Sequence, residues 1–199
     1  WPVVQGEMRH PQTKGGASGL FGWVTSSRMY IKQENFKTER MLTFYAEPLA
    51  VFASLLGSPY PQNFIDLAYN WLLQNHGHDV ISDDAVYRFR QAREISSCIL
   101  ERAMLDLAGS IDLSGWSSER MALVVYNPAP FPRSEVITAL IDIPAEWKCK
   151  SFEIIDMEGR VLPMQIVKTS SPFYPIVQSP NDVANIFPSS RYEARVEFK

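Results

Sequence analysis

Residues 82–109 read SDDAVYRFRQAREISSCILERAMLDLAG and carry a continuous helical pattern. Ser82 is a good N-cap residue, and the two aspartates that follow it favour the positive end of a helix dipole. Gly109 closes the pattern. Apolar residues recur every three or four positions at Val86, Phe89, Ala92, Ile99, Ala103 and Leu107. The stretch therefore predicts one long amphipathic helix.

Two more helices are predicted before this one. The first follows the N-cap candidates Ser26 and Ser27 and ends at Gly57, with a kink where Pro48 removes a backbone hydrogen bond. Its predicted apolar face consists of Met29, Phe36, Leu42, Tyr45, Leu49, Phe52 and Leu56.

The second begins at Pro61 and ends at Gly77, with an apolar stripe of Phe64, Ala68, Trp71 and Leu72. Short connections between three helices favour an antiparallel three-helix bundle.

The hydrophobic period changes to two after residue 119. Ile137, Ala139, Ile141 and Ile143 alternate with other residues and predict a strand. Further strands are expected at residues 121–126, 152–155, 161–167 and 192–198, and a loop at residues 169–190. Pro163 cannot donate to a β-ladder, so its strand should be an edge or bulged. These strands are too few to close a sandwich, and they predict a partial antiparallel β-sandwich.

The fold class expected is therefore α+β in two parts. We expect an irregular arm at 1–25, a three-helix bundle domain at 26–112, and the start of a C-terminal β-sandwich domain at 118–199. Because the chain begins at Trp1 and stops at Lys199 inside an alternating pattern, we expect it to be a piece of a longer protein.

The composition is that of a globular protein. The 199 residues are 46% hydrophobic and 21% charged, with a net charge of -3, which disfavours disorder and a nucleic-acid partner. No apolar run approaches the length of a membrane span. Cys98 and Cys149 suggest idle thiols in a reducing compartment, and no signal peptide is visible, so we expect a cytoplasmic protein.

The turn Asn75-His-Gly-His-Asp79 joins two predicted helices and is the best candidate for chemistry. Imidazole nitrogen and carboxylate oxygen are both good zinc ligands, which directs attention to His78 and Asp79. A zinc site needs three or four ligands, so spacing alone favours a polar turn with solvated histidines.

Other candidates have simpler explanations. Asp83 and Asp84 suit a helix start. The expected solvated face of the third helix carries Arg88, Arg90 and Arg93. A sugar platform could use Trp23, Tyr60, Tyr69 and Trp71, although aromatic residues at helical spacing are more often core. The glycines at residues 15–19 match no phosphate loop, and no nucleophile has a recognisable setting.

Several short motifs occur in an order that resembles the central region of bacterial α-mannosidases of glycoside hydrolase family 38. They are Gly6-Glu-Met, residues 26–33, Ala46-Glu-Pro-Leu-Ala50 and Asn75-His-Gly-His-Asp79 in the helical part, then Val125-Tyr-Asn-Pro128 with Arg133, Asp156-Met-Glu-Gly159 and Pro163-Met-Gln165 in the β part. The likeness covers roughly residues 5 to 167.

This resemblance implies a zinc-dependent retaining glycosidase that hydrolyses terminal α-mannosides. It implies that His78 is a zinc ligand and that Asp79 contacts the sugar, while an N-terminal domain absent from this chain supplies the catalytic carboxylates and the other zinc ligands. No catalytic residue is then expected here, and the chain alone should be inactive and hold no zinc. A homo-oligomer is compatible with this prediction.

The sequence departs from the family where Val80 and Ile81 lead straight to Ser82, a few residues shorter than usual. The alternative is a non-catalytic relative that serves as a scaffold or a carbohydrate-binding module.

Overall fold

The computed structural model of the protein describes residues 3, 27–173, 176–179, 182–186 and 188–198. The chain divides into two compact units between Ser114 and Gly115, and each is described by itself. Apart from Val3, the predicted arm at 1–25 lies outside the described residues, as does the N-cap candidate Ser26.

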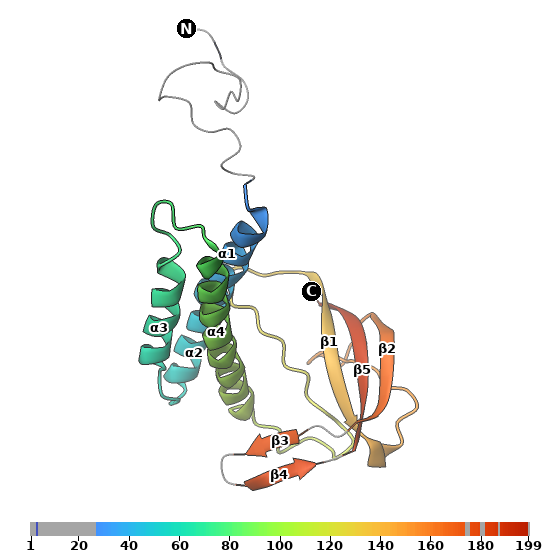
Figure 1. The fold of residues 1–199 in the computed structure, drawn as a ribbon. Helices are drawn as coiled ribbons and strands as arrows, with labels where there is room; N and C mark the ends of the chain where they lie inside the picture. Colours follow the sequence, from blue (N-terminus) through green and yellow to red (C-terminus); the bar gives the residue numbers. More distant parts are fainter. Residues whose placement is uncertain (1–2, 4–26, 174–175, 180–181, 187, 199) are drawn as a thin grey trace, which may run out of the picture. The chain divides into compact units, whose positions relative to one another are not determined.

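The first unit is helical. It contains α1 (Met29–Met41), the π-helix η1 (Leu42–Ala46), α2 (Glu47–Leu55), α3 (Gln62–Leu73) and α4 (Asp83–Gly109). The long helix α4 packs against α1, α2 and α3 (Figure 1). The helix predicted from residues 82–109 is confirmed, with Ser82 as its N-cap residue.

Pro48 interrupts the first helix as predicted, and the interruption takes the form of η1 directly before α2. A proline lacks an N–H donor, and its ring crowds the carbonyl four residues earlier, so wider i→i+5 turns suit the chain here. The end at Gly57 is also confirmed. Gly57 has φ 102°, and the Ser58 N–H donates to the Ala53 carbonyl at 3.1 Å, which is a Schellman motif.

Two predicted helix ends are wrong. The first helix begins at Met29 after Arg28, whose φ of 49° is left-handed, so Ser27 is not the N-cap residue. Helix α3 ends at Leu73 rather than at Gly77, because the chain tightens into i→i+3 bonds there. The Asn75 N–H donates to the Leu72 carbonyl at 3.1 Å.

The predicted apolar face of the first helix is only partly right. Leu42 and Leu49 are buried, but Met29, Phe36, Phe52 and Leu56 are exposed. The buried stripe of α1 instead includes Thr38, whose hydroxyl donates to the Glu34 carbonyl at 2.8 Å. A hydroxyl group whose hydrogen bond is satisfied can be buried. A prediction from apolar residues alone therefore misplaced part of the buried face of this helix. In α3, Phe64 is likewise exposed, and Ile65 is buried in its place.

The core of this unit lies where α1, α3 and α4 meet. Its buried cluster consists of Ile31, Leu42, Ala68, Leu72, Ala85, Phe89 and Ala92. Among the described residues, no helix combines the length and apolar character needed to cross a membrane.

The second unit is mainly β. It contains β1 (Glu135–Pro144), the 3-10 helix η2 (Ala145–Trp147), β2 (Met164–Phe173), β3 (Ile176–Ser179), β4 (Asp182–Ile186) and β5 (Ser189–Phe198). Antiparallel pairing gives one sheet with the order β1-β5-β2 and a second sheet of β3 and β4 (Figure 1). The fold is therefore α+β, as predicted.

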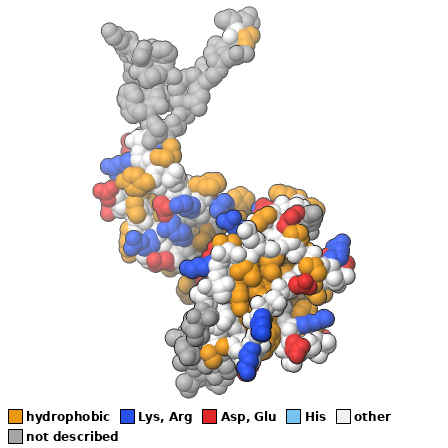
Figure 2. Space-filling model, turned by 90° about the vertical axis from the view of Figure 1, so that its right-hand side faces the viewer, with side chains coloured by type: hydrophobic (Ala, Val, Ile, Leu, Met, Phe, Trp, Pro, Cys, Tyr) orange, Lys and Arg blue, Asp and Glu red, His pale blue; other side chains and the backbone are white. Residues whose placement is uncertain are grey.

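The alternation in β1 is confirmed, because Ala139 and Ile143 are buried and Ala139 lies opposite the buried Ala194 of β5. Pro163 directly precedes β2, which is an edge strand of the sheet as predicted. Hydrophobic side chains gather on the face of this unit that Figure 2 shows.

Three β predictions need correction. Residues 121–126 form no strand in the described part of the chain. Residues 152–155 contribute only an isolated bridge between Ile155 and Val161. Residues 169–190 are not a loop but hold the end of β2, the β3–β4 hairpin and the start of β5. Pro172 fits within β2 because it falls at a register shift of the β2–β5 ladder.

Candidate functional site

The turn between α3 and α4 has a buried base at Asn75, which is 7% exposed. Its side-chain amide donates to the Trp71 carbonyl at 3.4 Å, and its side-chain oxygen accepts from Arg88 of α4 at 3.3 Å. Asn75 thus joins the end of α3 to the first turns of α4.

His76 turns toward α1. Its Nε2 lies 2.7 Å from Oδ1 of Asn35, so the imidazole donates from Nε2 to the amide oxygen. The His76 backbone N–H donates to the Leu73 carbonyl at 2.9 Å. The first histidine of the motif is therefore engaged within the helical unit.

His78 and Asp79 project into solvent, with side chains 94% and 87% exposed. Nδ1 of His78 lies 2.9 Å from Oδ2 of Asp79, which leaves Nε2 of the imidazole and Oδ1 of the carboxylate facing outward. Asp79 has φ 61°, a left-handed conformation that aspartate tolerates better than most residues. The sharp turn thus presents two adjacent groups that can bind a metal, an imidazole and a carboxylate.

The far end of the turn is held by Arg28, which precedes α1. Its guanidinium donates to the Ile81 carbonyl at 3.0 Å and lies 3.8 Å from the Asp83 carboxylate. Ser82 follows, with its N–H donating to the Val80 carbonyl at 2.8 Å. Both ends of residues 74–82 are therefore fastened to helices, while the tip is open.

These residues fit a contribution to a zinc site, because imidazole nitrogen and carboxylate oxygen are both zinc donors. Within the described part of the chain, no group of three or more His, Cys, Asp and Glu side chains could hold a metal. The described residues therefore offer a partial ligand set at His78 and Asp79.

Two of the predicted surface arginines have specific partners. Arg88 contacts Asn75, and Arg93 pairs with Glu34 of α1. Hydrogen bonds from Arg93 and Lys37 hold the pKa of Glu34 below its usual value. Arg93 thus joins α4 to α1, and Arg88 joins α4 to the turn before it, which corrects the expectation of a merely solvated arginine face. The sequence analysis missed these contacts because Glu34 and Asn75 are distant from the arginines in sequence.

Three of the four aromatic residues considered for a sugar platform contact other protein groups. The Tyr69 hydroxyl donates to Oε2 of Glu47 at 2.5 Å, and burial together with this bond raises the pKa of Tyr69. Burial and Glu47 also raise the pKa of Tyr60. Trp71 packs against the core and meets Tyr87 edge-on at 5.9 Å. Trp23 lies outside the described residues.

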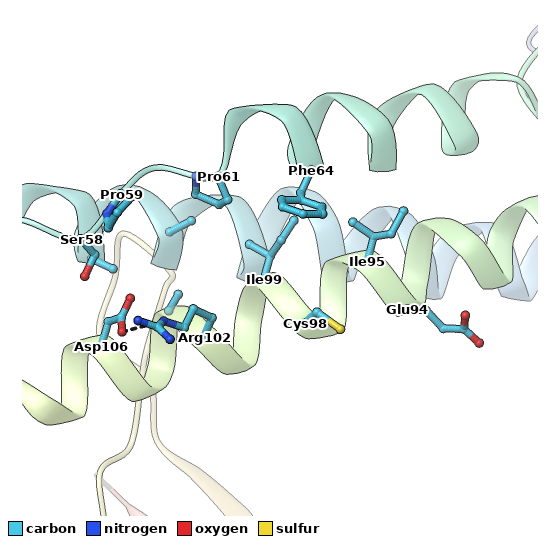
Figure 3. A pocket seen from close by; sticks show the side chains of 13 residues that line it. Ser58, Pro59, Pro61, Phe64, Glu94, Ile95, Cys98, Ile99, Arg102 and Asp106 are labelled. Atoms are coloured by element: carbon cyan, nitrogen blue, oxygen red, sulfur yellow. Dashed lines mark ion pairs between the residues drawn. The ribbon is translucent and has the colours of Figure 1, made fainter. Parts of the chain in front are cut away.

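A cleft of about 380 Å³ lies between α2, the start of α3 and α4 (Figure 3). Its walls are mostly apolar, and the ion pair of Arg102 and Asp106, 2.9 Å apart, stands at one end. None of its lining residues belongs to the turn at 74–82. The sequence analysis missed this cleft, although small residues at Ala50, Ala53 and Ala103 help to leave it open.

Comparisons with known proteins find similar sequences and folds among glycoside hydrolases. No family model matches the chain. A curated protein of Halalkalibacterium halodurans, provisionally named mannosylglycerate hydrolase, is 26% identical over 132 residues, 62% of this chain and 14% of that protein.

Two solved structures from Enterococcus faecalis match the fold over 86% of this chain at 25% identity. One is an α-mannosidase from strain V583, with a TM-score of 0.74. The other is a protein of glycosyl hydrolase family 38, with a TM-score of 0.71.

The two solved structures are glycoside hydrolases by name, and this chain is similar to one region of them in sequence and fold. The resemblance to the family 38 α-mannosidases predicted from the short motifs is therefore confirmed. The chain spans 22% and 23% of the two solved chains and 14% of the curated relative.

Proposed function

We propose that this chain forms part of a zinc-dependent retaining α-mannosidase that hydrolyses terminal α-mannosides. The observation that carries the proposal is the exposed His78–Asp79 pair, set on an anchored turn in a chain whose fold matches an α-mannosidase. Active-site residues are often found on loops that a rigid scaffold positions.

In this proposal the two side chains divide the work. His78 would hold the metal through Nε2, since its Nδ1 faces Asp79. Asp79 accepts from His78 through Oδ2 and would offer Oδ1 to a sugar hydroxyl. A bound zinc ion would orient vicinal sugar hydroxyls and favour ring distortion.

The carboxylates for nucleophilic attack and proton transfer would come from an N-terminal catalytic domain of the same protein, outside this chain. His76 is the less suitable zinc ligand of the two histidines, because its Nε2 already contacts Asn35.

The decisive experiment substitutes the pair in the complete enzyme that the proposal requires. His78→Ala should remove most of the bound zinc and lower kcat/KM for an aryl α-mannoside by about 100-fold or more, because second-shell changes alone typically cost 10–100-fold. Asp79→Asn should keep the zinc and raise KM, since it weakens a sugar contact. Mannosylglycerate should be assayed in parallel, given the provisional name of the curated relative.

Asp84→Asn is the matched control, because Asp84 is an exposed carboxylate in the first turn of α4, outside the turn. Unchanged zinc content and activity in His78→Ala would contradict the proposal. The 199-residue chain alone should hydrolyse no α-mannoside and hold no stoichiometric zinc. Glycan binding without hydrolysis by the complete protein would favour the alternative, a non-catalytic carbohydrate-binding relative.

A further inference from the structure

Three side chains fasten the turn at 74–82 without belonging to the proposed ligand pair. Asn35 of α1 contacts His76, Arg88 of α4 contacts Asn75, and Arg28 contacts the Ile81 carbonyl. They come from sequence positions on both sides of the turn, as far as 53 residues away. Asn35 and Arg28 thus hold the turn from outside the two helices that it connects, and Arg88 holds it from α4.

The tip of the turn has little support of its own. Both side chains at the tip are almost fully exposed, and Asp79 holds a left-handed backbone conformation. Gly77 lies just before them and adds conformational freedom. A catalytic geometry that shifts by about 1 Å can lose about 100-fold in rate, so an unsupported tip would present a ligand poorly.

We propose that Asn35 and Arg88 are positioning residues for the His78–Asp79 pair, Asn35 through His76 and Arg88 through the buried Asn75. This inference rests on the proposed function of that pair. Asn35 holds His76 through a 2.7 Å contact between its amide oxygen and Nε2 of the imidazole. Arg88 holds Asn75 by donating to its side-chain oxygen at 3.3 Å. Outer partners of metal-binding groups commonly orient the inner ligands in this way.

The first test measures the turn itself, in the chain as described. Asn35→Ala removes the acceptor for His76, and the backbone amides of residues 76–82 should then exchange with solvent about fivefold faster. Asn35→Asp keeps an acceptor and should restore slow exchange. Asn70→Ala is the control, because it removes a 3.0 Å bond from Gln74 that stays within one segment of the chain.

The second test measures ligand presentation in the complete enzyme. Asn35→Ala and Arg88→Met should each weaken zinc affinity by about 10-fold and lower kcat more than they raise KM, with thermal stability nearly unchanged for Asn35→Ala. Asn35→Asp and Arg88→Lys should recover most of the affinity. If Arg88→Met unfolds the protein, the Asn35 pair of variants decides alone.

The outcomes separate this inference from the function beneath it. If His78→Ala abolishes zinc binding while Asn35→Ala changes neither exchange nor affinity, positioning by Asn35 is overturned and the proposed function stands. If His78→Ala leaves zinc and activity intact, the proposed function fails, whatever the exchange data show.

Discussion

Two polar turns of this protein, residues 74–82 and residues 156–160, use their side chains in opposite ways. In the second, Oδ1 of Asp156 accepts the backbone N–H groups of Glu158 and Arg160 at 3.0 and 2.8 Å. The Arg160 guanidinium then pairs with the carboxylates of both Asp156 and Glu158. The polar side chains of this turn largely satisfy one another.

The turn at 74–82 is instead held by side chains that lie outside it. Its stems are held by Asn35, Arg88 and Arg28, so its own His78 and Asp79 face solvent. Self-contained turns stabilise a local bend, whereas externally anchored turns can expose reactive groups without losing their shape. This difference separates a structural turn from a candidate site, although both carry glycine, acids and bases.

The largest expected effect lies beneath the anchored turn. Leu72 is 2% exposed, and Leu72→Ala should lower the free energy of unfolding of the helical unit by about 2–5 kcal/mol. The matched change next to the other turn, Ile155→Ala, should cost less than about 1 kcal/mol because Ile155 is already 46% exposed. Urea unfolding followed by circular dichroism measures both, and equal effects would remove the contrast between the turns.

The glycines of the two turns should respond with opposite signs. Gly159 has φ 81°, so Gly159→Ala should destabilise by about 1 kcal/mol. At Gly77 an added Cβ would meet only Val80, at an ordinary 3.5 Å, and Gly77→Ala should be neutral or stabilise by about 0.5 kcal/mol. Thermal unfolding checks both variants. A large loss for Gly77→Ala would mean that this turn needs the freedom of glycine.

The smallest expected effect is the response of the turn at 156–160 to low pH. Burial opposes ionisation of Asp156, but hydrogen bonds and the charge of Arg160 hold its pKa below the ordinary 3.8. The folded pKa is depressed, so the stabilisation is complete above the unfolded value near 3.8 and is lost as pH falls through the lower folded value. The amide signals of Glu158 and Arg160 should therefore hold their positions down to about pH 4 and shift below it. Asp156→Asn should remove that acid shift.

Local sequence signals predicted much of the fold. Ser82 marks a helix start, Gly57 a Schellman end, and the alternation from Ile137 to Ile143 a strand, because each of these depends on neighbouring residues alone. Contacts between distant segments were not predictable in this way. Thr38 is buried because its hydroxyl bonds to its own helix, and the β3–β4 hairpin forms in a proline-rich stretch that looked irregular.

The same division applies to the candidate site. The motif located the turn and singled out His78 and Asp79, and their roles stay predictions. The structure adds what sequence could not, since the partners of His76 and Asn75 lie 41 and 13 residues away. Only these distant contacts show that His76 is already hydrogen-bonded within the helical unit.

The strand order β1-β5-β2 has a consequence for how the second unit assembles on the ribosome. In the described sheet, β1 and β2 pair with β5 and not with each other, and Glu135 meets Phe198. The backbone groups of β1 and β2 that bond to β5 therefore stay unpaired until residues 189–198 have been synthesised. Such non-local pairing slows folding and exposes unpaired edges to other chains. The helical unit ends at Ser114, so all of its residues have been synthesised well before the sheet can be completed.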